Sequence, residues 1–159
     1  MNVLDVMTFY PVTIHPNASL AEALGKMKEV GCHHLPVISN EKHLIGVLSF
    51  HDCQQALGDP LREKGQLHDE ALARSLLVSH AMTPAPVIIE ADAPAHEAGR
   101  LMLEQYIGCL PVMRGETLIG IVTRSDLMMA FMHLSQHIAG QTAEQKGHSF
   151  SSFEKKSAP

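Results

Sequence analysis

The chain has 159 residues, of which 45% are hydrophobic and only 4% aromatic, so it can build one compact domain or two small ones that pack together. It has no tryptophan and nine methionines, which predicts an aliphatic core with thioether side chains filling the gaps. Its formal net charge is −5, whereas a protein that tracks nucleic-acid phosphates needs a basic stripe. We therefore exclude nucleic acid as a partner.

The cysteines and the N-terminus indicate a cytoplasmic protein. Cys32, Cys53 and Cys109 are an odd number without a C-x-x-C pair, which favours reduced thiols over a disulfide framework. The N-terminus lacks a basic region followed by an apolar stretch, and the apolar runs fall short of the ~20 residues that cross a bilayer. We expect no membrane partner.

The sequence contains two copies of one pattern. A Met-Thr pair, a Leu-Pro-Val motif and many residues between them recur at a constant offset of 75, and after one residue drops out a Leu-Ile-Gly motif recurs at an offset of 74. Such a duplication implies two structural units, with function expected where the copies face each other. The predicted parts are repeat 1, a partly helical connector, repeat 2 and a polar flexible tail, at residues 1–58, 59–79, 80–140 and 141–159.

Repeat 1 has the predicted order β-α-β-β-α. Short aliphatic runs bounded by turn residues predict strands at residues 11–14, 35–38 and 44–49. Ser19 and Glu22 form a capping box at the start of an amphipathic helix, and Gly31 ends it. A second, short helix starts near Asp52.

Repeat 2 has the same order, with strands predicted at residues 86–89, 110–113 and 118–123. Pro94 lies in the first turn of its first helix, where a missing N–H costs little. The last helix starts at Asp126 and keeps an apolar face to about Gly140, and its Met-rich residues 127–132 are predicted to be core and dimer contact. From Gln141 onward the composition is typical of a tail that cannot bury enough surface to order itself.

Each copy ends its third strand with the motif Gly-x-x-(Ser/Thr)-x-x-Asp. The motif places Ser49 three residues before Asp52, and Thr123 three residues before Asp126. A carboxylate can accept hydrogen bonds from two adjacent ribose hydroxyls while the alcohol adds a third polar contact. The alternative is that both aspartates only cap a helix. Two copies with the same spacing favour sugar binding.

The order of these motifs, repeated, resembles the cystathionine-β-synthase (CBS) domain as a tandem pair, over roughly residues 3–134. The resemblance implies an α/β (α+β) fold in which two β-α-β-β-α repeats pack sheet to sheet with pseudo-two-fold symmetry. It also implies two clefts for adenosine-containing ligands such as AMP, ADP, ATP or S-adenosylmethionine, and a homodimer.

The resemblance also implies the residues of each cleft. The main ligand-binding cleft is Thr8, Val12, Thr13, His33, His34, Leu35, Pro36, Thr123, Arg124, Ser125 and Asp126. The second, weaker cleft is Ser49, His51, Asp52, Thr83, Val87, Ile88, Leu110 and Pro111. Arg124 would face phosphate with its fork of donors, and His33 and His34 fall where some nucleotide-binding relatives carry basic residues. Phe50 stands in place of the arginine in the second cleft, so we expect that cleft to be weak, empty or used by a less negatively charged adenosyl ligand.

These features predict a regulatory module that senses an adenine nucleotide, with or without Mg²⁺, or S-adenosylmethionine. The ligand would bridge the repeats and change their angle or the dimer geometry, and an unidentified regulated protein would respond. No nucleophile, base and orienter constellation and no Gly-rich phosphate loop emerges, so we expect no enzyme activity.

Two other readings of the sequence stay open. The chain could be a constitutive dimerisation or scaffold module whose clefts are non-functional. A more distant alternative is a metal or redox sensor, since His133 and His137 lie four residues apart, but no third ligand is evident and we expect no metal.

Overall fold

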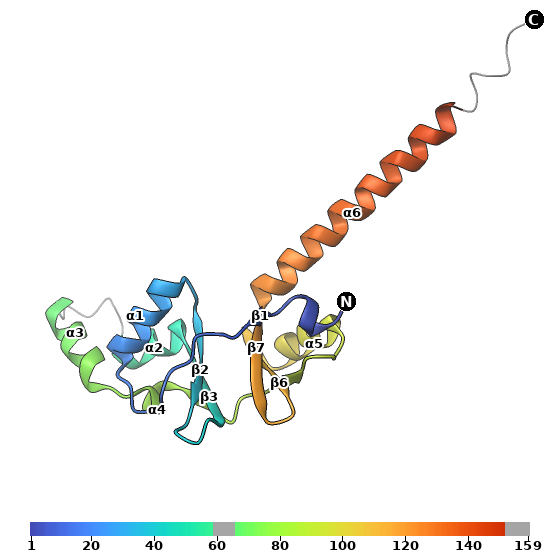
Figure 1. Ribbon diagram of the computed structural model, residues 1–159. Coiled ribbons are helices and arrows are strands. Elements are labelled where there is room, and N and C mark those ends of the chain that lie inside the picture. Colours follow the sequence, from blue (N-terminus) through green and yellow to red (C-terminus); the bar gives the residue numbers. More distant parts are fainter. Residues whose placement is uncertain (59–65, 152–159) are drawn as a thin grey trace, which may run out of the picture.

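The computed structural model describes residues 1–58 and 66–151, and it arranges them as two lobes with one long helix that projects away from both (Figure 1). The helices are η1 (Val3–Asp5), α1 (Leu20–Val30), α2 (Phe50–Leu57), α3 (Gln66–Ser75), α4 (Val78–Ala81), α5 (Ala95–Glu104) and α6 (Arg124–Ser151). The strands are β1 (Thr8–Phe9), β2 (His34–Ile38), β3 (Leu44–Ser49), β4 (Thr83–Pro84), β5 (Ile89–Glu90), β6 (Cys109–Arg114) and β7 (Thr117–Thr123). The predicted hairpins are confirmed as β2–β3 and β6–β7.

The two sheets exchange short strands between the repeats. One sheet has the order β2-β3-β4 and the other β1-β7-β6-β5. β1 of repeat 1 pairs with β7 of repeat 2, placing Thr8 opposite Ile121. β4 of repeat 2 pairs with β3 of repeat 1, placing Thr83 opposite Val47. Each repeat therefore holds a strand of the other. The segments that follow β1 and β4 connect the two repeats, so the relative position of the repeats depends on these segments.

The packing confirms the predicted α/β fold with two sheets facing each other. Val47 of β3 is buried against Cys109 and Ile121 of the other sheet. On its own side each sheet has a separate aliphatic core, with Leu35 and Leu48 at the centre of one and residues of β6 and β7 in the other. Burial of such aliphatic side chains at the facing surfaces fixes the pseudo-two-fold arrangement.

A glycine lies where each exchanged segment crosses its new sheet. A Cβ on Gly46 would lie 2.6 Å from Sδ of Met82 and 3.0 Å from the carbonyl oxygen of Thr83. A Cβ on Gly120 would likewise lie 3.0 Å from the carbonyl oxygen of Thr8. Only a residue without a side chain allows this approach, which explains the glycine of the Leu-Ile-Gly motif.

The ends of the first helix follow the sequence signals in part. The backbone N–H of Glu22 donates to Oγ of Ser19 at 3.1 Å, whereas no reciprocal bond from the Glu22 side chain completes the predicted box within the described residues. Gly31 ends the helix in the left-handed conformation, with φ 73°. Tyr106 follows α5 at the repeat-equivalent position and also has a positive φ, 56°.

Three expectations about the elements were wrong. Residues 11–13 form no strand and Ile14 makes only a single bridge to Val37, because Tyr10 turns the chain at φ 48° and Pro11 has no N–H to donate. In repeat 2 the strand predicted at residues 86–89 is β5, which begins only at Ile89.

Helix α6 is also longer than expected, since it passes the predicted end near Gly140 and continues to Ser151. Glutamine, alanine, glutamate and lysine in residues 141–151 are good helix formers. The rest of the predicted tail, residues 152–159, and residues 59–65 of the connector lie outside the described residues; α3 and α4 occupy the remainder of the connector.

Candidate functional site

Two open grooves lie between the repeats. The larger has a cavity of about 600 Å³ and contains Asp52 in its wall, and the smaller has about 530 Å³ and contains Asp126. We call them the Asp52 groove and the Asp126 groove. Both fall within the ~300–1,000 Å³ of ordinary small-molecule sites.

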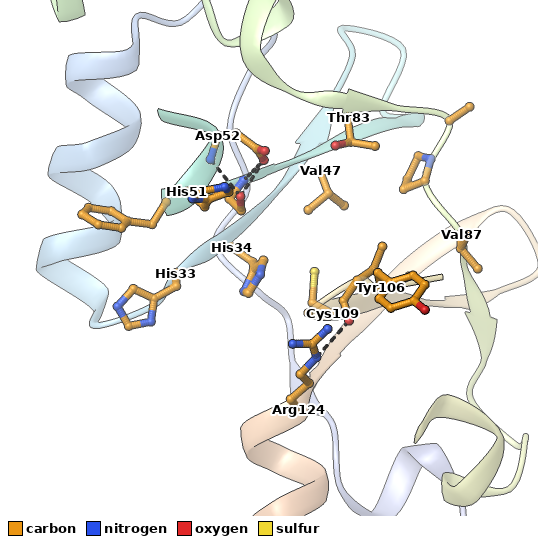
Figure 2. Close-up of a pocket in the computed structure, with 16 residues that line it drawn as sticks. His33, His34, Val47, His51, Asp52, Thr83, Val87, Tyr106, Cys109 and Arg124 are labelled. Atoms are coloured by element: carbon orange, nitrogen blue, oxygen red, sulfur yellow. Dashed lines mark hydrogen bonds between the residues drawn. The ribbon is translucent and has the colours of Figure 1, made fainter. Parts of the chain in front are cut away.

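The Asp52 groove takes its walls from both repeats. Figure 2 shows Asp52 and His51 from α2, and His33 and His34 from the start of β2, on one side of it. Residues of repeat 2 complete the wall: Thr83, Ala85, Pro86, Val87, Tyr106, Ile107, Gly108, Cys109 and Arg124. A ligand in this groove would therefore contact both copies.

The aspartates of the two motifs both cap a helix. Oδ2 of Asp52 accepts from the backbone N–H of Ser49 at 2.7 Å and from its hydroxyl at 2.6 Å. Oδ2 of Asp126 accepts from the N–H of Thr123 at 2.7 Å and from its hydroxyl at 2.6 Å. The hydroxyl oxygen in turn accepts from the aspartate N–H, at 3.1 Å in repeat 1 and 3.3 Å in repeat 2.

The caps use one carboxylate oxygen of each aspartate. Within the described part of the chain, Oδ1 of Asp52 and Oδ1 of Asp126 accept no hydrogen bond. Both side chains are half-buried and line a groove. The aspartates thus support the start of a helix, but as the third residue of a capping box and not as the N-cap itself, which is Ser49 in α2. This arrangement leaves an acceptor on each carboxylate for a ligand hydroxyl.

The basic side chains gather where the two grooves meet. Arg124, His33 and His34 line both grooves. Nε of Arg124 donates to the carbonyl oxygen of Ile107 at 3.1 Å. Burial lowers the pKa of His34, and His33 and Arg124 lower it further, while Asp52 raises it. In Figure 2 this imidazole lies between Asp52 and Arg124.

Most of the residues predicted for the clefts line a groove. In the Asp126 groove these are Thr8, Val12, His33, His34, Thr123, Arg124, Ser125 and Asp126. In the Asp52 groove they are Ser49, His51, Asp52, Thr83 and Val87.

The other predicted residues lie outside both walls. Leu35, Pro36, Leu110 and Pro111 are fully buried, and Leu35 and Leu110 belong to the two aliphatic cores. Thr13 and Ile88 follow the turns after β1 and β4 and line neither groove. The Leu-Pro-Val motif therefore builds the core beneath the grooves.

Comparison with known proteins settles the family. The family described as CBS domain matches residues 3–59 and 78–133, which are the two repeats. The chain belongs to the CBS domain family.

Its relatives include stand-alone CBS proteins of the same size. A CBS domain-containing protein of Dictyostelium discoideum is 35% identical over 142 residues, which cover 88% of this chain and 97% of that protein. CBSX2 of Arabidopsis thaliana, solved in complex with AMP, is 26% identical with a TM-score of 0.70, over 84% of this chain and 98% of CBSX2. A CBS domain pair solved with 5′-methylthioadenosine and S-adenosyl-L-methionine is 24% identical with a TM-score of 0.68, over 84% of this chain and 97% of that one, and shows the same fold.

Sequence reasoning left Tyr106 and Ile107, in the loop between α5 and β6 of this CBS pair, out of the predicted clefts. Tyr106, Ile107, Gly108 and Cys109 all line the Asp52 groove. Their repeat-equivalents are Gly31, Cys32 and the two histidines, which line the Asp126 groove. The duplication itself carried this signal, since a loop that faces a groove in one copy is expected to do so in the other.

Two further observations concern the described residues of the CBS pair alone. No group of three or more His, Cys, Asp or Glu side chains is arranged to hold a metal ion there. None of the helices in the same residues combines the length and the apolar character that a membrane span requires.

Proposed function

We propose that this CBS pair is a regulatory module that binds an adenosine-containing ligand, an adenine nucleotide or S-adenosylmethionine, in the grooves between its repeats. One observation carries the proposal: in both copies the aspartate lines an open groove, and its hydrogen bonds to the start of its own helix use Oδ2 and leave Oδ1 as an acceptor. A helix cap needs neither a groove beside it nor a free carboxylate oxygen, whereas a ribose site needs both the groove and the free oxygen.

The remaining walls suit the rest of such a ligand. Val47, Val87 and Ile107 provide apolar surface in the Asp52 groove, and Val12, Val30 and Ile121 do so in the Asp126 groove. A purine has a flat apolar face that such side chains can cover. Arg124 supplies a guanidinium for phosphate in either groove. The AMP complex of CBSX2 supports the choice of adenosine.

Regulation would follow from the exchanged strands. Ser49 and Asp52 come from repeat 1, whereas Thr83 comes from the strand of repeat 2 that pairs with β3, and Val87 follows that strand. A ligand that holds both sides favours the repeat angle at which both contacts are made, by no more than its difference in affinity between the two arrangements. A regulated protein would respond to that angle.

We also propose that two chains associate through α6. The sequence predicted core and dimer contact for residues 127–132, but most of these side chains are exposed: large apolar side chains with at least 48% exposure are Met128, Met129, Phe131, Met132, Leu134 and Ile138. A helix that projects from the body with such a surface fits a dimer contact. Light scattering should give twice the chain mass, and Phe131→Glu should halve it.

A thermal-shift screen with AMP, ADP, ATP with and without Mg²⁺, NAD and S-adenosylmethionine tests the proposal. A ligand at 100 times its Kd adds ~2.7 kcal/mol to the free energy of unfolding, which means a rise of several degrees in Tm. Inorganic phosphate and GMP are the controls for the charge and for the base. A Tm that no adenosyl ligand raises would leave a scaffold module, in which both aspartates act only as caps.

A further inference from the structure

The two grooves share one piece of wall. His33, His34, Gly108 and Arg124 line both of them, and we call these four residues the shared wall. It forms where the repeats touch, because a Cβ on Gly108 would lie 3.1 Å from Nε2 of His34. The backbone N–H of Arg124 also donates to the carbonyl oxygen of Gly108 at 3.1 Å.

The shared wall breaks the symmetry of the duplication. The repeat-equivalents of His33 and His34 are Gly108 and Cys109, and the repeat-equivalent of Arg124 is Phe50. The ribose-binding parts, by contrast, are present twice, as Ser49 with Asp52 and Thr123 with Asp126. The chain therefore carries two sites for a sugar but only one set of basic groups.

The charges facing the grooves come from few residues. Arg124 is the one lysine or arginine among the residues that line either groove. The histidines of the walls are His33 and His34, with His51 in the Asp52 groove alone. Asp52 and Asp126 add negative charge on opposite sides. A phosphate in either groove must use the same guanidinium.

The guanidinium is free to do this. Arg124 is exposed, and its side-chain bond to Ile107 uses Nε, so within the described residues both terminal nitrogens lack an acceptor. The bond to Ile107 holds the base of the fork in place and leaves the two terminal groups for a ligand. One phosphate in a bidentate contact takes one N–H from each terminal group and fills the end of the fork, since the Nε–H is already bonded to Ile107.

We infer that the two grooves compete for a single phosphate-binding centre, so that one chain holds one phosphate-bearing nucleotide at a time. This inference rests on the proposed function and specifies its stoichiometry. A second nucleotide would find the fork occupied and would bring its phosphate near the first, where like charges repel. An uncharged nucleoside needs no guanidinium and is not subject to this competition.

Isothermal titration calorimetry with AMP and with adenosine tests the inference. We expect one AMP per chain, with any second AMP bound at least tenfold more weakly. We expect two adenosines per chain, and the affinities of the two adenosine sites should differ from each other less than those of the two AMP sites. Arg124→Gln should lower the affinity for AMP at least tenfold and change the affinity for adenosine less than twofold. Two AMP sites of equal affinity would overturn the inference and leave the proposed function intact.

Phe50→Arg is the gain-of-function variant, since it places an arginine at the repeat-equivalent position. Phe50 is 39% exposed and stands edge-on to His33 with ring centroids 5.9 Å apart, so an arginine can replace it without opening a core. We expect this variant to bind two AMP per chain with similar affinity, while the matched control Phe50→Leu binds one. A single AMP in a folded Phe50→Arg chain would contradict the inference. Failure of AMP, adenosine and every other adenosyl ligand of the thermal-shift screen to bind the wild type would overturn the proposed function, and this inference with it.

Discussion

Oγ of Ser49 lies 2.6 Å from Oδ2 of Asp52, and Thr123 and Asp126 repeat the same contact in the other copy. The two roles that the sequence set against each other, helix cap and ligand site, can therefore be served by different oxygens of one carboxylate. Under the proposed function, a substitution of either aspartate changes both stability and binding. The two effects have to be measured separately.

Asp52→Ala and Asp126→Ala should each lower the free energy of unfolding by about 1 kcal/mol, the usual loss for a helix cap. Each should also weaken adenosine binding in its own groove by tenfold or more, because a hydrogen bond to a charged group contributes about 1.5–3 kcal/mol. Urea unfolding and calorimetry measure the two losses.

Asp5→Ala is the matched control for these variants. Oδ2 of Asp5 accepts from the backbone N–H of Asn2 at 2.7 Å, so it caps η1 as the other aspartates cap their helices. It lines neither groove. This variant should lose stability and keep its affinity for adenosine; unchanged affinity in all three variants would reduce Asp52 and Asp126 to caps.

Tyr106→Gly should stabilise the fold and weaken ligand binding in the Asp52 groove. Tyr106 adopts φ 56° where repeat 1 has Gly31, and it is 90% exposed at the wall of the Asp52 groove. Relief of the left-handed conformation outweighs the entropy of glycine and adds up to about 1 kcal/mol. Loss of an aromatic face for the base should weaken binding in this groove about tenfold.

Tyr10→Gly separates the two effects. Tyr10 has φ 48° and is 85% exposed, but it lines neither groove. It should gain stability on substitution and bind adenosine as the wild type does. If both tyrosine variants kept full affinity, Tyr106 would have no role in the ligand site.

How much could be predicted from the sequence depends on whether a signal is local. Ser19 and Gly31 mark the ends of α1 because capping acts within one turn, and the β2–β3 hairpin follows from two aliphatic runs around a polar turn. Pairing of Thr8 with Ile121 has no local signal, since it depends on how the copies pack. The same holds for the shared wall and for the burial of Leu35, which the resemblance to the CBS family placed in a cleft.

Gly46→Ala should destabilise the protein by about 1–3 kcal/mol, the usual cost of overpacking. The new methyl group would meet Sδ of Met82 at 2.6 Å and, at 3.0 Å, a carbonyl oxygen that cannot move without the exchanged strand β4. Gly25→Ala is the control, because nothing lies within 4 Å of a Cβ there and the residue is inside α1. It should gain about 0.5–1 kcal/mol. Equal effects in urea unfolding would contradict the close approach at Gly46.

The thiols should differ sharply in reactivity. Burial, with the charge of Asp52, raises the pKa of Cys53 to about 11 and that of Cys109 to about 12, so few thiolates form at pH 8. Cys32 is half-exposed at the wall of the Asp126 groove. A thiol reagent at pH 8 should modify one cysteine quickly in the native protein and three in urea.

Cys32→Ser identifies the fast thiol, and a fast reaction that survives in this variant would show that Cys53 or Cys109 is accessible. The reagent also reports which groove a ligand occupies. A nucleotide in the Asp126 groove should slow the reaction of Cys32, and one in the Asp52 groove should leave it unchanged.

Acidification should lower the free energy of unfolding of the unliganded protein, because His34 takes up a proton on unfolding. Its pKa is lowered in the folded state by burial and by His33 and Arg124, although Asp52 opposes them. The unfolded chain, with a pKa near 6.5, therefore binds the proton first. The free energy of unfolding falls as the pH drops through about 6.5, and the loss is complete only below the lowered pKa of the folded state.

Urea unfolding at pH 7.5 and at pH 5.5 measures this loss. His34→Gln keeps a polar side chain at the shared wall without an ionisable group, so its stability should fall less between the two pH values than that of the wild type. His96→Gln is the control, since this imidazole is exposed on α5 and lines neither groove. The wild type and the control should lose stability equally. If His34→Gln lost as much as they do, the proton that destabilises the fold would bind elsewhere.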